Sequence, residues 1–573
     1  MKNGNKKTLE CDLCVIGGGI AGMAAAVSAA REGLKVVLIH DRTVLGGNAS
    51  SEVRMWIRGA STRFPEYKEG GLVEELALDD MFYNTKMNWS LWDLVLLNKV
   101  RAEKNVTLLL SSTCCGAEEE DGIIKSVTAW KTDEYVFYNV KAKLYADCSG
   151  DSVLAEFTSA QFVSGRESKF DYGEPMAHER ADDNTMGNSI LLQYRPAQKN
   201  ETEDCAVVPL TDDKFADSLK RRLPSASAFV PQENFWWLEL GGNRNALRDN
   251  GQLTNELTSL AATTHEYIRG KVNQSGYMLD WIGSLAAKRE TRRYVGDYVL
   301  TANDILASTP FDDEIAYGGW PMDDHYPEGL YSEKPNINYC FEKPYAIPYR
   351  CIYSKNIENL LFAGRNISVT HLALSSTRVM ATCAMLGHAA GFAAVVAVRH
   401  GVLARGAGEY VGEIQQLLRL HDCYLLRTER EKVIAFPDAE RNLEGKDNAT
   451  VLKTGESRTF SVPKKFYRFV RIVFDSDFLR SEIKDEPKTA ELKRFPSLCY
   501  NALGTVTVKT PSSLVKDFSL TFDEDERTTI KIENNRQRLV LVPLNREIDK
   551  ITFCATKTRG SKDVRLFSID VVE

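Results

Sequence analysis

Three glycines near the N-terminus have the spacing of a phosphate-binding turn. Gly17, Gly19 and Gly22 follow the apolar run 11–16 and precede an Ala-rich stretch. In a strand–turn–helix unit, the first glycine allows the tight turn, the second lets the backbone reach a pyrophosphate, and the third lets the helix pack near the strand. The free N–H groups at the helix N-terminus would bind the phosphates. The turn therefore predicts a dinucleotide site, which also includes Ile20 and Ala21.

The next predicted strand, residues 35–39, ends in a possible ribose ligand. The chain continues His40-Asp41-Arg42, and an acidic residue at this position accepts hydrogen bonds from ribose hydroxyls in dinucleotide-binding folds. His40 or Asp41 could occupy it, depending on the register. Asp41 is favoured because a carboxylate accepts two hydroxyl hydrogen bonds. Arg42 is included in the predicted site.

A second glycine pair changes the expected cofactor from NAD to FAD. Leu45-Gly46-Gly47-Asn48-Ala49-Ser50-Ser51 follows the strand end, and here the sequence resembles the large FAD-dependent oxidoreductase family with a glutathione-reductase-like nucleotide domain. In that family the glycine pair lies along the diphosphate and ribityl chain. The resemblance implies FAD as cofactor, with further ligands at Gly46, Gly47, Asn48, Ser50 and Ser51.

Three later segments carry the same resemblance. Ala146–Asp151 is similar to the family's strand and turn near adenine, Ala287–Asp297 to its Arg-rich segment, and Asn359–Gly391 to its closing flavin motif. Many relatives have Gly-Asp in the closing motif where this chain has Gly364-Arg365, so Asn366 could replace the ribityl contact. The implied cofactor site includes Ser149, Gly150, Asp151, Gly364, Arg365, Asn366, Arg378, Val379 and Met380.

Two histidines are candidates for proton transfer. A flavin would accept hydride at N5, so the protein must move a proton, and histidine suits this because its pKa is near neutral. His371 is the first candidate, because the resemblance places it near the isoalloxazine, although a core histidine fits equally well. His325 is the second, in the turn-rich segment 318–327, where Asp323 could orient it; a solvated loop pair is the alternative.

Arginines and tryptophans could bind the substrate. Arg350 is taken into the catalytic set as an anion-binding residue, and Arg54, Arg289 and Arg292 are further candidates, since arginine binds carboxylates bidentately. Each alone is more often structural. A stacking platform for a sugar could form, although aromatic residues are more often core; its candidates are Trp56, Trp236, Trp237 and Trp320.

The order of the elements that position these residues predicts an α/β protein. Several domains are expected, because 573 residues are too many for one core. The fold class is a Rossmann-like FAD domain of the glutathione-reductase type, with an inserted α+β substrate domain and a C-terminal β-sandwich. The FAD domain is expected over 8–170 and 286–445, the insertion over 171–285, and the strand-rich sandwich over 446–573. The resemblance is to the subgroup with such a tail, often mislabelled as related to xanthan lyase.

Composition limits the partners and the compartment. The net charge of −7 argues against an extended nucleic-acid surface. The N-terminus lacks the apolar core of a secretory signal, and no membrane span is expected. The 12 cysteines show neither zinc nor iron–sulfur spacing, and Cys11 and Cys14 fit core packing in a strand. Scattered thiols favour a reducing, cytoplasmic location. The oligomeric state is not predicted.

The sequence thus predicts an FAD-dependent oxidoreductase that acts on a small polar molecule by hydride transfer at flavin N5. A carbohydrate or a hydroxy or unsaturated acid is favoured, the sugar by fold-level analogy with the tail. One alternative is a flavin monooxygenase or halogenase that needs a reductant, for which no second nicotinamide-type glycine motif is found. The other is a non-catalytic glycan-binding protein with a degenerate flavin fold.

Overall fold

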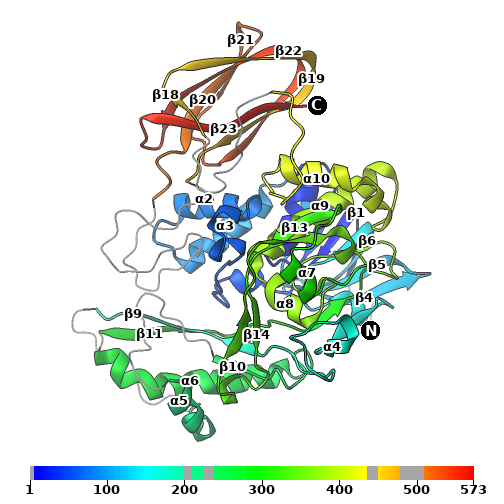
Figure 1. Cartoon of the computed structure of the whole chain (residues 1–573), viewed down its shortest axis with the longest axis vertical. Coiled ribbons are helices and arrows are strands. Elements are labelled where there is room, and N and C mark those ends of the chain that lie inside the picture. The colour runs from blue at the N-terminus through cyan, green and yellow to red at the C-terminus, as the bar shows by residue number, and fades with distance from the viewer. Residues whose placement is uncertain (1–4, 199–209, 224–237, 275, 435–448, 478–508) are drawn as a thin grey trace.

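A mixed sheet with a parallel, Rossmann-like core lies at the centre of the protein. The computed structural model describes residues 5–198, 210–223, 238–274, 276–434, 449–477 and 509–573 (Figure 1). The sheet order is β3-β2-β1-β6-β5-β4, with β17 also paired to β6. Five of its strands are parallel: β1 (Lys6–Ile16), β2 (Val36–Ile39), β3 (Val106–Leu109), β6 (Val136–Asp147) and β17 (Leu360–Phe362).

Two antiparallel strands extend the sheet on one side. They are β4 (Ser112–Glu120) and β5 (Ile123–Lys131). The alternation in residues 123–130 and 136–140 predicts the antiparallel pair of β5 with β6, whereas β4 is not predicted. The sequence suggests two strands at 136–140 and 144–148, whereas the structure has the single strand β6. The reason is that β1 pairs with β6 over almost its whole length, from Lys6 opposite Phe137 to Ile16 opposite Asp147.

Helices α1 (Ile20–Arg31) and α9 (Met380–His400) pack closely against each other. A Cβ at Gly387 would lie 2.1 Å from the carbonyl oxygen of Ala21, and one at Gly391 would lie 2.5 Å from that of Ala25. The sequence suggests one helix over 376–400, but the chain forms the short helix α8 (His371–Thr377) and then a separate α9. The break at Arg378 and Val379 turns both residues toward the cavity described below.

Helix α9 is long and apolar enough to cross a membrane, with a mean hydropathy of 1.8 in its most apolar window. The expectation that the chain has no membrane span stays a prediction, since this finding rests on length and composition only. In the structure, 94% of that window is buried inside the protein. Its apolar composition is that of a core helix, because it packs against α1 and α10 (Val411–Leu420).

A second hydrophobic core lies in the middle of the chain and is centred on Leu192, Tyr194, Phe215, Leu253 and Leu257. Two strand pairs and two helices surround it: β8 (Asn188–Ile190) with β10 (Leu238–Leu240), β9 (Leu192–Pro196) with β11 (Tyr277–Ile282), α5 (Ala216–Arg222) and α6 (Asn250–Gln274). In Figure 1 these elements form the lower part of the molecule. The candidates Trp236 and Trp237 lie outside the described residues.

The rest of the described chain before the C-terminal region contains four α-helices and three two-stranded sheets. The helices are α2 (Leu72–Tyr83), α3 (Trp89–Arg101), α4 (Lys169–Tyr172) and α7 (Ala302–Ala307). The strands form the pairs β7 (Phe162–Ser164) with β12 (Arg292–Tyr294), β13 (Glu314–Gly318) with β16 (Tyr345–Pro348), and β14 (Met322–His325) with β15 (Asn336–Tyr339). Strand β14 carries the candidate residues Asp323 and His325.

The C-terminal region is antiparallel β structure, with the sheet order β18-β23-β19-β22-β20-β21. Its strands are β18 (Thr450–Lys453), β19 (Ser457–Phe474), β20 (Val515–Phe522), β21 (Asp525–Ile532), β22 (Leu539–Thr558) and β23 (Asp563–Val572). The described strands form one six-stranded sheet, so the two-sheet sandwich stays a prediction. The domain boundaries stay predictions too, and the one at 445/446 lies outside the described residues.

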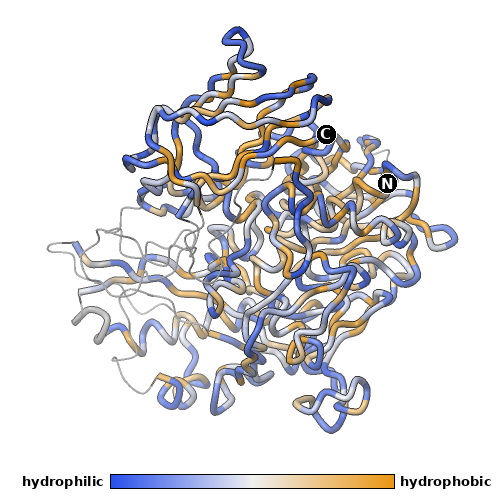
Figure 2. Tube along the Cα trace, turned by 45° about the horizontal axis from the view of Figure 1, so that its top comes forward, coloured by the Kyte–Doolittle hydropathy of each residue, from blue (hydrophilic) through white to orange (hydrophobic). Residues whose placement is uncertain are grey.

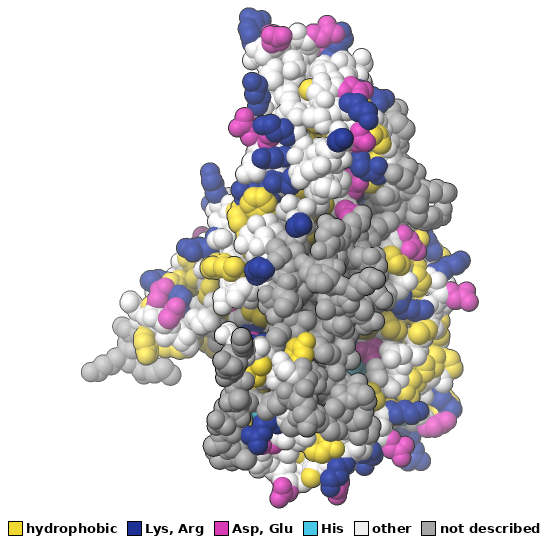
Figure 3. All heavy atoms as spheres, turned by 90° about the vertical axis from the view of Figure 1, so that its left-hand side faces the viewer, with side chains coloured by type: hydrophobic (Ala, Val, Ile, Leu, Met, Phe, Trp, Pro, Cys, Tyr) yellow, Lys and Arg dark blue, Asp and Glu magenta, His cyan; other side chains and the backbone are white. Residues whose placement is uncertain are grey.

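Apolar segments run through the interior of both the central and the C-terminal sheets, whereas turns and loop tips are polar (Figure 2). On the face in Figure 3, both basic and acidic side chains are scattered over the C-terminal sheet. Cys11 and Cys14 belong to β1, and burial raises the pKa of the Cys11 thiol to about 12. This pair therefore contributes to strand packing, as predicted from its context.

The α1–α9 contact gives a stability test. Gly387→Ala should lower the free energy of unfolding by about 1–3 kcal/mol, because the new methyl overlaps the backbone of α1. Gly412→Ala is the matched control: Gly412 is exposed in α10 with no atom near the added Cβ, and alanine should stabilise the helix by up to about 1 kcal/mol. Urea unfolding measures both, and equal midpoints for the two variants would contradict the packing argument.

Candidate active site

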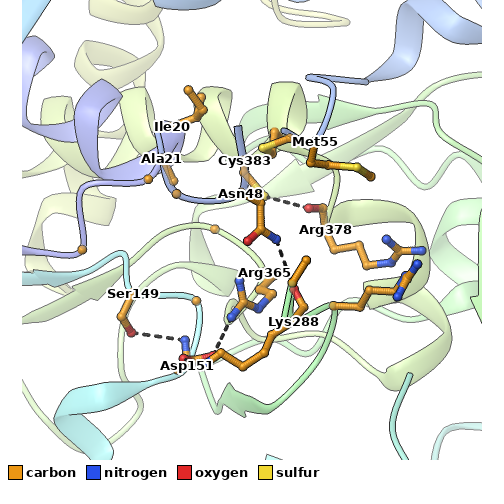
Figure 4. A pocket seen from close by; sticks show the side chains of 18 of the residues that line it. Ile20, Ala21, Asn48, Met55, Ser149, Asp151, Lys288, Arg365, Arg378 and Cys383 are labelled. Atoms are coloured by element: carbon orange, nitrogen blue, oxygen red, sulfur yellow. Dashed lines mark hydrogen bonds and ion pairs between the residues drawn. The ribbon is translucent and has the colours of Figure 1, made fainter. Parts of the chain in front are cut away.

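A cavity of about 1080 Å³ lies at the carboxyl ends of the parallel strands. Its wall includes Ile16 at the end of β1, Gly17 directly after it, Ile39 at the end of β2, and Cys148 directly after β6. Ligands of open α/β sheets bind at this edge. Figure 4 shows the cavity with Ile20 and Ala21 of α1 above, Ser149 and Asp151 to one side, and Arg378 on the other.

Gly19 leaves room for a ligand that the protein itself does not fill. Its φ of −67° and ψ of 178° suit any residue, and a Cβ there would approach only the Cα of Gly47, at 4.0 Å. Gly22 does not line the cavity. Its role is different: a Cβ there would lie 1.8 Å from the carbonyl oxygen of Gly17, so only glycine fits at this helix contact. The second glycine thus keeps space at the N-terminus of α1, and the third allows the helix to pack.

His40 and Asp41 have distinct roles. His40 is buried, and both ring nitrogens bind the loop: Nδ1 accepts from the N–H of Gly18 at 2.9 Å, and Nε2 lies 3.0 Å from the carbonyl oxygen of Val44. Burial lowers the pKa of His40 to about 4, so the ring is neutral and Nε2 donates. Asp41 lines the cavity with a side chain 61% exposed. The geometry thus favours Asp41 over His40 as the ribose ligand.

The glycine pair 46–47 approaches the first turn. The N–H of Gly46 donates to the carbonyl oxygen of Gly18 at 2.8 Å, and φ values of +102° at Gly46 and +58° at Gly47 explain the choice of glycine. Asn48 lines the cavity, and its Nδ2 donates to the carbonyl oxygen of Lys288 at 3.3 Å. Arg42 also lines the cavity, and its Nη1 donates to the carbonyl oxygen of Gly47 at 3.2 Å.

Ser50 and Ser51, predicted as cofactor ligands, do not line the cavity. Ser50 is fully buried, and its Oγ accepts from the N–H of Glu52 at 3.3 Å. The N–H of Ser51 donates to Asp93 at 3.0 Å. Both serines therefore shape the loop from behind, because the chain turns away from the cavity after Asn48.

The wall opposite α1 is made by Ser149, Gly150, Asp151, Gly364 and Arg365. Arg365 Nη2 donates to Asp151 at 2.5 Å, and Lys288 pairs with the same carboxylate. Although burial opposes ionisation, these two cations hold the pKa of Asp151 at about 2. Arg365 stands where the closing flavin motif often has an aspartate, and its guanidinium neutralises the Asp151 carboxylate.

Asn366, considered as a substitute ligand, does not line the cavity. It is fully buried, and its Nδ2 donates to the carbonyl oxygen of Asp147 at 3.2 Å. Asn366 therefore connects the strand ends of β17 and β6, and Gly364 and Arg365 are the residues of this segment that face the ligand space.

Another part of the wall carries the groups that could act on a substrate. His325 Nδ1 lies 2.7 Å from Glu239, and its Nε2 lies 3.1 Å from Asp323. Arg378 Nη2 lies 3.2 Å from Asp323, and Arg289 Nη1 lies 3.4 Å from Glu239. Although burial opposes ionisation, the hydrogen bond from His325 and the charge of Arg378 hold the pKa of Asp323 well below its usual value.

Two guanidinium groups lie close enough to repel each other here. The side chains of Arg289 and Arg378 are each only 9% exposed. Burial lowers the pKa of Arg378, and the positive charge of Arg289 lowers it further. Nε of Arg378 and Nε1 of Trp320 are buried without a hydrogen-bond partner among the described residues. Such a cationic surface suits an anionic ligand.

His371 is not the cavity base that the sequence suggests. It is buried outside the lining, and its Nδ1 and Nε2 lie 2.9 Å from Glu290 and 3.0 Å from Asp324. Burial opposes the charge, but the two carboxylates raise the pKa of His371 to about 10. The ring is therefore an imidazolium at neutral pH and has no free lone pair to accept a proton.

The structure also places three predicted arginines outside the lining. Arg350 is 44% exposed and pairs with Asp313 at 2.9 Å. Arg54 lies over the Trp281 ring at 4.2 Å from its centroid, and Arg292 pairs with Glu156. Arg289, by contrast, is in the cavity, as are Trp56 and Trp320. These positions follow from tertiary packing, so residue type alone could not separate the four arginines.

Sequence reasoning missed several residues of the site. Glu239 is the clearest, and its signal is an acidic residue between two leucines, since a charge in a buried strand needs a partner. Glu239 acts through its contacts with His325 and Arg289, whereas residues that line the cavity itself and were not singled out are Met55, Arg58, Arg222, Lys288, Asn336 and Cys383. Among the described residues no group of His, Cys, Asp and Glu could hold a metal ion.

A family model described as FAD dependent oxidoreductase matches residues 12–418. Glycerol-3-phosphate dehydrogenase of Mycobacterium leprae (strain TN) is 41% identical over 68 residues, which are 12% of this chain and 11% of that protein. The chain thus spans about a tenth of the length of this relative. FAD is the cofactor of the matched family, and the open space beside Gly19 and the glycine pair 46–47 fit it.

Two solved structures are similar to this chain at low identity. A geranylgeranyl bacteriochlorophyll reductase-like protein from Thermoplasma acidophilum is 12% identical, with 72% of this chain and 86% of that chain covered and a TM-score of 0.31. The myxobacterial chondrochloren halogenase CndH is 13% identical, with 70% and 78% covered and a TM-score of 0.31.

The space at Gly19 gives a direct test of cofactor binding. Gly19→Val should lower the FAD affinity by more than about tenfold, because the side chain would occupy the place where the backbone approaches the pyrophosphate. The unfolding midpoint of the apoprotein should not change, since the backbone angles suit valine. FAD fluorescence titration measures the affinity, and Gly116→Val in β4 is the control. Unchanged FAD binding would refute this position for the diphosphate.

Proposed function

This chain belongs to the FAD-dependent oxidoreductase family, and from that premise we propose that it interconverts a small hydroxy acid or unsaturated acid with its oxidised or reduced partner. The observation that carries the proposal is the pair of buried guanidiniums, Arg289 and Arg378, in the cavity wall. Arginine binds a carboxylate with two parallel hydrogen bonds, and a carboxylate between two arginines relieves their repulsion.

The charge of the whole wall supports an acid over a neutral sugar. Seven Lys and Arg side chains line the cavity against three Asp carboxylates. The diphosphate of FAD would account for part of this excess, to which Arg58 and Arg222 contribute. None of the described lining residues comes from the C-terminal sheet, on which the carbohydrate expectation rested. The acid is therefore the better-supported half of that expectation.

FAD is proposed to bind in the extended pose of the glutathione-reductase type. Gly17, Gly19 and the α1 N-terminus would hold the diphosphate, and Asp41 the ribose hydroxyls. Gly46, Gly47 and Arg365 would lie along the rest of the cofactor, and Val379 and Met380 begin α9 at the same wall. When bound, FAD supplies a hydride acceptor or donor at N5.

His325 is proposed to move the proton. Its ring nitrogens face Glu239 and Asp323, and these two contacts hold the ring at the cavity wall. In the direction of reduction it would protonate the substrate, and in the direction of oxidation it would take the hydroxyl proton, by microscopic reversibility. Asp323 and Glu239 hold the ring in place, while Arg289 and Arg378 orient the acid.

The substrate class is tested by anaerobic mixing. Hydroxy acids should bleach the flavin absorbance of the holoenzyme, and unsaturated acids should restore it after photoreduction, because the positive charges of Arg289 and Arg378 attract an anionic substrate. Neutral sugars of the same size are the control. Bleaching by sugars alone would overturn the acid proposal, and fast reduction by NADPH with no acid effect would favour a monooxygenase or halogenase.

The role of His325 is tested separately. His325→Asn should slow substrate-driven flavin reduction by about 10²–10⁴-fold, the usual contribution of a positioned acid or base, without loss of FAD. His400→Asn is the control, since His400 also binds a glutamate, Glu413 at 2.7 Å, but lies at the exposed end of α9. Stopped-flow absorbance gives both rates, and an unchanged rate in His325→Asn would exclude His325 from proton transfer.

A further inference from the structure

The cavity wall has an ionic layer behind it that the proposed chemistry does not use. Two segments present neighbouring residues to opposite sides. In one, Arg289 faces the cavity while Glu290 is fully buried behind it. In the other, Asp323 and His325 face the cavity while Asp324 lies behind β14. Alternation along an extended chain explains the arrangement.

His371 connects the two segments from behind. Its Nδ1 donates to Glu290 at 2.9 Å and its Nε2 to Asp324 at 3.0 Å, so one ring spans both back carboxylates. Glu290 is fixed further by Arg293, which is fully buried, and by the N–H of Met186 at 3.0 Å. The N–H of His371 donates to Glu167 at 2.8 Å, which fixes the start of α8.

We propose that His371 is a positioning residue, which holds Arg289 and the Asp323–His325 pair at the separation that a bound carboxylic acid requires. It contacts neither the cavity nor a substrate and acts through Glu290 and Asp324. The inference deepens the proposed function and rests on it for the identity of the ligand. Two carboxylates around one buried ring also explain why His371 stays an imidazolium, with its pKa raised to about 10.

Positioning and long-range electrostatics predict opposite signs for one substitution. His371→Gln removes a positive charge and Asp324→Asn removes a negative charge, and neither residue lines the cavity. If charge alone mattered, the first would weaken anion binding and the second would strengthen it. If His371 positions the wall, both weaken anion binding, because each breaks the same connection.

The experiment titrates the FAD-loaded full chain with oxalate, which has two carboxylates and no hydrogen that could leave as hydride. The change in flavin absorbance gives the dissociation constant. Both His371→Gln and Asp324→Asn should raise it about tenfold, since displacement of a positioning group by about 1 Å has effects of this size or larger. The dissociation constant of the double variant should be no higher than that of the single variant that binds oxalate less tightly, because both changes break one chain of contacts. His400→Gln is the control and should bind oxalate as the parent does.

A second measurement does not depend on the ligand. Diethyl pyrocarbonate modifies unprotonated imidazole, and peptide mass spectrometry gives the rate at His325. Displacement of β14 would break the bonds of His325 to Glu239 and Asp323, so both variants should react faster at this residue.

The outcomes separate the two ideas. Tighter oxalate binding in Asp324→Asn, or unchanged oxalate binding and unchanged His325 reactivity in both variants, would overturn the positioning role. If the parent protein does not bind oxalate, the acid proposal loses support, and the His325 reactivity alone decides the role of His371. If His371→Gln does not retain FAD, Asp324→Asn carries the test, because its side chain is partly exposed and the fold should tolerate the change.

Discussion

The close approach of α1 to its neighbours determines the position of most groups around the cavity. On one side α1 packs on the glycine turn, where a Cβ at Gly22 would lie 1.8 Å from the carbonyl oxygen of Gly17. On the other side α9 comes so near that Gly387 admits no side chain. Because both helices begin at the cavity, this contact brings the α1 N-terminus and the start of α9 to one ligand space. The small residues are therefore a requirement of geometry as well as of packing.

Electrostatic compensation organises the rest of the wall. Each buried charge described near the cavity has a partner: Asp151 binds Arg365 and Lys288, Asp323 binds Arg378, and Glu239 binds Arg289. Burial penalises single charges strongly, so such pairs are needed for the fold to be stable. The cationic excess that remains is the feature that suits an anionic cofactor and an anionic substrate.

Two histidines in similar settings have different roles because of where they face. His325 and His371 each lie between two carboxylates. His325 is at the cavity, where a substrate could replace a carboxylate partner, whereas His371 is buried behind the wall.

The C-terminal sheet supplies no described lining residue of the cavity. Buried contacts join it to the rest of the protein, among them Arg538 with Asp422 and Arg471 with the carbonyl oxygen of Leu420.

The sequence by itself determined the nucleotide-binding half of this protein. The order of apolar run, Gly17-x-Gly19-x-x-Gly22 and Ala-rich helix is local, so the turn, the α/β class and FAD followed from spacing and resemblance. The tertiary structure decided which side chains face the ligand. Asp323 and Asp324 are neighbours in sequence but lie on opposite sides of β14, and Arg350 and Asn366 are engaged elsewhere. Such choices depend on contacts between segments far apart in the chain, like His371 with Glu290, and no local pattern records them.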